Sequence, residues 1–148
     1  MAKRVEPVRK SVKDVLEDVL QGHRAVAFTG PEPALKYLRR TLGGQMSLPN
    51  AVKAVAYDLV AEAEAQLQRW DAVDEAVTLA LANLPAMEAD LGHGYRDRLE
   101  AMTCFERGIQ ARIARGDFQG ALALCEQAIA LDLGAHYEAK RDSLEWAR

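Results

Sequence analysis

Aromatic side chains, cysteines and long apolar runs are all scarce in this sequence. Phe, Trp and Tyr make up 6% of the 148 residues, and the cysteines are Cys104 and Cys125. Two cysteines are too few for a disulfide scaffold or a cysteine-rich zinc site. No apolar run reaches the length of about eighteen residues that a membrane span needs, and the basic start lacks the apolar core of a secretory signal. We therefore expect a cytoplasmic protein with two reduced cysteines.

The residues that are abundant favour a helical protein. Apolar residues form 49% of the chain and charged residues 28%, and alanine and leucine dominate the apolar set. Both residues favour helices, whereas β-branched and aromatic residues favour strands. The length is that of one domain. The composition therefore predicts an all-α fold.

Charge is distributed unevenly along the chain, although the net charge is only −3. Residues 1–53 hold ten Lys and Arg against five Asp and Glu, and residues 54–148 hold nine against seventeen. Such asymmetry can indicate a basic arm for an acidic partner. The other interpretation is that the basic part packs on the acidic part, within one chain or between two.

Apolar residues spaced by three and four positions predict a series of amphipathic helices. The first spans residues 5–21, and Gly22 is expected to end it. Residues 23–29 suit a short strand or a helical turn, with no second strand for them to pair with. Residues 86–96, which include Gly92-His93-Gly94, are expected to form an irregular connection. The other predicted helices span residues 34–42, 49–69, 71–84, 95–115, 118–131 and 135–148.

Two of the predicted helix pairs, residues 49–84 and 95–131, share a pattern of small side chains after a very short turn. Asp71 and Asp117 are matching candidate N-caps, and Ala76 then compares with Ala121. Antiparallel helices joined by so short a turn approach closely, which only small side chains permit. The residues expected to pack in the repeats are Ala76, Ala80, Gly108, Gly116, Phe118, Ala121, Cys125 and Ala128.

The second pair resembles a tetratricopeptide (TPR) repeat, because a Gly-Asp-aromatic turn at 116–118 precedes the small residues and Ile-x-Leu-Asp follows at 129–132. The resemblance is strongest over 105–132 and degenerate over 55–85. Ala76 and Ala121 are 45 positions apart, against about 34 in the family, so an insertion near 86–96 is required. The resemblance implies stacked helix-turn-helix repeats in residues 46–148, with 135–148 as a C-terminal capping helix and a basic helical segment at 1–45.

The resemblance also implies a protein-interaction module or scaffold that binds another protein or a peptide. TPR domains often clasp peptide tails with Lys, Asn and Arg on inner helix faces, but the comparable places here hold Ala61, Ala65, Glu106 and Gln110. A chaperone C-terminal tail is therefore not the expected ligand. A stack of so few repeats leaves a face uncovered, which predicts a homodimer.

An alternative function rests on the basic residues near the start of the chain. A regulatory protein with such an arm would bind nucleic acid or another acidic partner. No recognition-helix pattern accompanies the cluster, so nucleic acid is not favoured. The residues of this basic contact surface are Lys3, Arg4, Arg9, Lys10 and Lys13.

Residue patterns for catalysis are weak throughout. The stretch from Gly30 to Lys36 lacks the second glycine and the Lys-Ser/Thr pair of a phosphate-binding loop. Asp90, His93 and Asp97 lie in a glycine-containing connection rather than on one rigid face, as metal ligands require. No serine or cysteine has a nearby base that would activate it. We expect no enzyme activity, no cofactor and no metal site.

Overall fold

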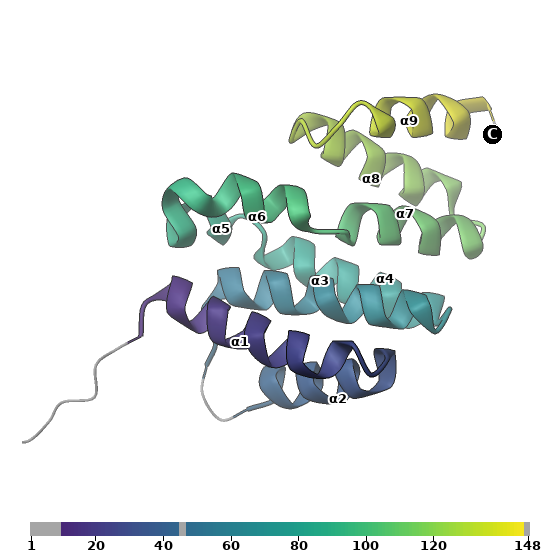
Figure 1. Ribbon diagram of the computed structural model, residues 1–148. Helices are drawn as coiled ribbons and strands as arrows, with labels where there is room; N and C mark the ends of the chain where they lie inside the picture. Colours follow the sequence, from purple (N-terminus) through teal and green to yellow (C-terminus); the bar gives the residue numbers. More distant parts are fainter. Residues whose placement is uncertain (1–9, 45–46, 147–148) are drawn as a thin grey trace, which may run out of the picture.

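The computed structural model describes residues 10–44 and 47–146, and this part of the chain is all-α (Figure 1). The three-residue 3-10 helix η1 joins α5 to α6. The helices are α1 (Val12–Ala27), α2 (Pro31–Leu42), α3 (Asn50–Gln66), α4 (Trp70–Asn83), α5 (Ala86–Leu91), η1 (Gly92–Gly94), α6 (Tyr95–Ala101), α7 (Cys104–Ala114), α8 (Phe118–Ala130) and α9 (His136–Trp146).

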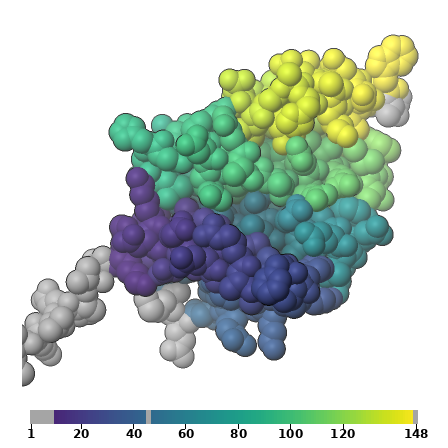
Figure 2. Space-filling view, viewed as in Figure 1, coloured from purple at the N-terminus to yellow at the C-terminus, as the bar shows by residue number. Residues whose placement is uncertain are grey.

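The helices stack as hairpins in chain order. The pairs α1–α2, α3–α4 and α7–α8 each pack together, α2 packs on α3, α4 on α7, and α8 on α9. The first helices of successive hairpins also touch, α1 with α3 and α3 with α7. Figure 2 shows this order as colours that run from the N-terminal hairpin to α9 at the opposite end. A single core runs through the stack from Leu16 to Leu144, across the predicted boundary at residue 45.

Helix α3 lies at the centre of the stack and is buried on nearly all sides. Its buried positions include six alanines, and α1, α2, α4, α5 and α7 all pack against it. Alanine brings neighbouring backbones close without loss of helix propensity. The alanine content of this segment therefore reflects a helix with five neighbours rather than an exposed, solvated helix.

The turns α3–α4 and α7–α8 have the same backbone geometry. Each has one residue in the left-handed region, Gln68 (φ 56°) or Gly116 (φ 79°). The residue that follows has φ −90° and ψ 75° at Arg69, and φ −91° and ψ 75° at Asp117. Its N–H donates to the carbonyl five residues back, from Arg69 to Glu64 at 3.0 Å and from Asp117 to Arg112 at 2.8 Å. Both hairpins thus end their first helix with the same C-terminal cap.

This shared turn corrects the predicted alignment of the two pairs. The left-handed residues are at positions 68 and 116, so equivalent residues are 48 apart and not 45. Asp71 is therefore not a cap: α4 begins at Trp70 after Arg69, and Asp71 lies in its first turn. Asp117 does cap α8, because its side chain accepts a hydrogen bond from the N–H of Gly120 at 2.9 Å. Since Gln68 replaces glycine in the first turn, the sequence hides the equivalence.

Helix α1 is longer at its C-terminal end than expected. Ser11 caps it by accepting from the N–H of Asp14, and the helix continues through Gly22 to Ala27. Gly22 does not end it; a Cβ at this position would collide with the Tyr37 ring of α2. The Tyr37 hydroxyl donates to the Val19 carbonyl at 3.2 Å. Glycine is needed there for the close approach of two helices.

Residues 86–103 form an insertion between α4 and α7. The predicted irregular connection at 86–96 is instead helical, because Met87 and Leu91 of α5 are buried and α5 packs against α3. The predicted single helix over 95–115 is interrupted at Met102, which has extended backbone (ψ 146°). Because of this break, α6 packs on α5, whereas α7 packs on α3, α4 and α8.

The outward faces at the two ends of the stack are mostly polar, although Phe28 after α1 and Trp146 of α9 are 83% and 90% exposed. On α9 the described side chains are exposed except Tyr137, Leu144 and the half-buried Arg141, and α2 exposes Glu32, Lys36, Arg39 and Arg40. Among the described residues no helix has the length and apolar content to cross a membrane. The homodimer expected from an uncovered face stays a prediction.

Candidate functional site

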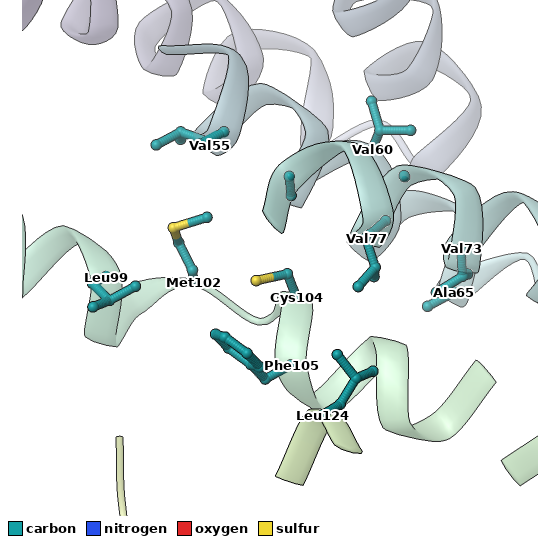
Figure 3. Packing of buried hydrophobic residues seen from close by; sticks show 14 of the residues in the cluster. Val55, Val60, Ala65, Val73, Val77, Leu99, Met102, Cys104, Phe105 and Leu124 are labelled. Atoms are coloured by element: carbon teal, nitrogen blue, oxygen red, sulfur yellow. The ribbon is translucent and has the colours of Figure 1, made fainter. Parts of the chain in front are cut away.

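The small residues of the repeats meet where α4, α7 and α8 cross. A Cβ on Gly108 of α7 would lie 2.8 Å from Val77 of α4 and 2.8 Å from Leu124 of α8. Figure 3 shows Val77 above Leu124 on one side of the start of α7, with the side chains of Cys104 and Phe105 on its other side. The other small residues from these helices are also buried, namely Ala76, Ala80, Ala121, Cys125 and Ala128.

Two residues of the predicted packing set do not lie in this contact. Gly116 is exposed, and it supplies the left-handed residue of the turn between α7 and α8. Phe118, expected to pack in the repeat, is 39% exposed at the start of α8. It follows the turn at the position of Trp70 in the preceding hairpin. The tight contact instead begins one turn later, at Ala121.

Replacing Gly108 by alanine is expected to destabilise the fold. The added methyl group would overpack the crossing by about 1–3 kcal/mol, against a gain in helix propensity of about 1 kcal/mol. A thermal or urea melt measures the result. Gly94→Ala is the control, because its Cβ would meet nothing within 4 Å. If both variants melted like the wild type, the close crossing would not exist.

Ion pairs tie the hairpins α3–α4 and α7–α8 together. The Nε of Arg112 donates to Asp74 at 3.1 Å, and its Nη1 donates to the Gly120 carbonyl at 2.9 Å. Arg115 pairs with Asp74 at 2.5 Å and with Asp71 at 3.1 Å. Asp71 and Asp74, near the start of α4, thus pair with the end of α7, which gives Asp71 a role different from the predicted cap.

A buried carboxylate of α3 lies at the start of α7. Asp58 is 4% exposed, and its Oδ1 accepts from the N–H of Thr103 at 2.9 Å. Thr103 precedes α7 and makes no side-chain cap of its own, so Asp58 caps this helix from another one. Burial raises the pKa of Asp58 to about 7, although hydrogen bonds from the backbone of Thr103 and Cys104 oppose the shift.

Glu62, one turn further along α3, completes this polar contact. Arg107 donates to it through Nε at 2.6 Å and through Nη2 at 2.8 Å. The Thr103 hydroxyl also lies 3.1 Å from the Glu62 carboxylate. The hydrogen bonds from Arg107 lower the pKa of Glu62. Sequence reasoning missed this cluster, although acidic residues within an alanine- and valine-rich helix were a usable signal.

A second buried carboxylate, Glu64, lies near the C-terminal end of α3, two residues after Glu62. It is 1% exposed, and its Oε1 accepts from Arg39 of α2 at 3.0 Å. Its Oε2 has no hydrogen-bond partner and is 3.7 Å from Nη1 of Arg69. Arg69 also pairs with Glu32 at 2.6 Å. This chain of charges joins the first hairpin to the second.

Two hollows on the surface of the described chain bear on binding. A groove of about 410 Å³ runs between α7 and α9, over Ile109, Ile113 and Tyr137. Its edges are polar, and one of them carries a contact of 3.2 Å between Nε2 of His136 and Oε1 of Glu106. The remaining groove residues are Arg107, Gln110 and Lys140.

The second hollow, which we call the insertion cleft, has a volume of about 500 Å³ and a largely apolar wall. It lies where the C-terminal ends of α4 and α8 meet the insertion. Glu88 is the one charged side chain among its lining residues. The apolar lining residues are Leu81, Leu84, Pro85, Met87, Tyr95, Leu99, Phe105, Ala130 and Leu131.

The predicted basic contact surface is only partly described. Lys3, Arg4 and Arg9 lie outside the described residues. Lys10 is exposed and pairs with Asp18 of α1 at 2.5 Å, and Asp18 raises its pKa. Lys13 is exposed on the same helix. The helix itself is held by apolar burial of Leu16, Val19 and Leu20.

The other sequence candidates are not drawn together. In the described ranges 10–44 and 47–146, no cluster of three or more His, Cys, Asp and Glu is arranged to hold a metal. Cys104 and Cys125 are both buried and free. Burial also raises the pKa of each thiol, which makes both poor nucleophiles at neutral pH. A comparison with protein-family models, curated proteins and solved structures found no match to this chain.

Proposed function

We propose that this protein is a cytoplasmic interaction module built of TPR-like helical hairpins, which binds a peptide segment of another protein in the groove between α7 and α9. The observation that carries the proposal is the groove itself, an apolar floor with polar edges between the first helices of successive hairpins. Repeat stacks commonly bind partners on such extended inner surfaces. The identical turns of α3–α4 and α7–α8 support the repeat.

The groove combines an apolar floor with exposed polar groups at its edges. The Tyr137 ring packs edge-on against Phe105, with ring centroids 6.4 Å apart, which makes the floor rigid. Gln110 and Lys140 are exposed at the edges. Arg107 is already bound to Glu62, so Lys140 is the cation of the groove that lacks an ion pair in the described structure. Self-association through an uncovered face stays a prediction and is not needed for this binding site.

Reversing the charge of Lys140 is expected to abolish capture of the partner. Tagged wild type, Lys140→Glu and the control Lys36→Glu would be compared as baits in lysate of the native host, with nuclease present. Lys36 is exposed on α2, away from the groove. The proposal predicts a protein bound by the wild type and by Lys36→Glu but not by Lys140→Glu. Equal capture by all three baits would contradict the groove as the binding site.

The same experiment without nuclease tests the alternative function. A basic N-terminal arm that binds nucleic acid would give a complex that nuclease destroys and that salt weakens steeply. A partner that resists both treatments favours the interaction module.

A further inference from the structure

We propose that the insertion cleft is a binding site for a small amphiphilic cation, a molecule with an alkyl-sized apolar body and one positive charge. The site is separate from the groove between α7 and α9, and it shares no lining residue with that groove. The inference therefore does not depend on the peptide-binding function.

The insertion makes this cleft. Without residues 86–103, α4 would lead directly into α7, as α8 leads into α9. The insertion contributes Met87 and Leu99, which are buried, and Tyr95, which is half-buried, to a wall completed by α4, α7 and α8. In repeat proteins, insertions often form the binding face. The segment that departs from the repeat is thus the one that surrounds the largest apolar hollow described.

The size and the lining of the cleft suit a small molecule. Ligand sites are typically hollows of about 300–1,000 Å³, apolar apart from a few polar groups that orient the ligand. The cleft has about 500 Å³. Its walls include Leu81 of α4, Leu84 directly after α4 and Leu131 directly after α8, all of them only half-buried.

The charge at the cleft selects a cation. Glu88 lines the cleft and has no ion pair among the described residues. The nearby Arg96 is already engaged, with Glu100 at 3.0 Å and with the Leu131 carbonyl at 2.5 Å, and it does not line the cleft.

The test uses dodecylammonium, dodecanol and dodecanoate below their aggregation concentrations, titrated into the full chain by calorimetry. We expect saturable binding in the order amine, alcohol, acid. Ala130→Trp, which fills the cleft from its edge, should weaken binding of the amine on the order of tenfold or more. Ala123→Trp is the matched control, because Ala123 is exposed on the same face of α8, about two turns away, and does not line the cleft.

Glu88→Gln separates charge recognition from apolar binding. The substitution should weaken binding of the amine by about two- to fivefold, as expected for the loss of an exposed ion pair. Binding of the alcohol should be unchanged. Thermal melts of each variant verify that it is folded. The proposal is overturned if the amine does not bind, if Ala130→Trp binds it as well as Ala123→Trp does, or if Glu88→Gln leaves the preference of amine over alcohol intact.

Discussion

A protein that lacks residues 1–21 should melt at a lower temperature than the full chain and should aggregate, at low salt and at high salt alike. The deletion removes Leu16, Val19 and Leu20, which are 7%, 5% and 7% exposed in the stack. Each such side chain contributes about 1.5–3 kcal/mol by burial, as an upper estimate. Helices α2 and α3, against which α1 packs, would then expose apolar surface to water.

Salt should not rescue or mimic this effect, because charge does not hold α1 in place. Its described ion pairs lie within the helix and its cap, between Lys10 and Asp18 and between Arg24 and Glu17. The contact between the basic and the acidic part of the chain is instead made from α2, where Arg39 pairs with Glu64 at 3.0 Å. Lys10→Gln is the control, since an exposed pair is worth about 0–1 kcal/mol. If the shortened protein stayed monodisperse with an unchanged melting temperature, the first helix would be an arm for an external partner.

The second large effect concerns the buried carboxylate of Asp58. Its pKa is raised from 3.8 to about 7 in the folded protein, so the folded state disfavours the charged form. The stability linked to this group is complete below pH of about 4 and is lost as pH rises through about 7. Between pH 5 and pH 8 the wild type should lose about 2–3 kcal/mol relative to Asp58→Asn, whose side chain does not titrate.

Asparagine is the informative replacement because it keeps an oxygen that accepts the Thr103 N–H. Chemical denaturation of both proteins at several pH values measures the difference. The neighbouring Glu62 does not affect the comparison, because the hydrogen bond from Arg107 lowers the pKa of Glu62 below its ordinary value of 4.5. Its contribution to stability is therefore constant between pH 5 and pH 8. Stability curves that run parallel from pH 5 to pH 8 would show that Asp58 is not buried in the folded protein.

The tertiary structure also assigned roles that no local pattern could supply. Gly22 has the residue type of a helix end, but it lies inside α1 because Tyr37 of α2 packs on it. Asp58 and Glu62 have the residue types of a solvated helix face. Instead Asp58 caps α7 and Glu62 accepts hydrogen bonds from Arg107 of α7, more than forty positions away in the chain. Residues 86–96 contain glycines typical of a loop, but burial of Met87 and Leu91 makes much of the segment helical.

The sequence by itself determined that the protein is helical, which segments form most of the helices, and that small residues at 76, 80, 108, 121, 125 and 128 allow close packing. These properties are local: they follow from helix propensity, from apolar residues spaced by three and four, and from side-chain size. Only the tertiary structure decided the register of the hairpins, the path of the insertion and the two hollows. They depend on contacts between residues far apart in the chain, and Gln68 in a glycine-like turn shows how packing overrides the local preference that sequence reasoning relies on.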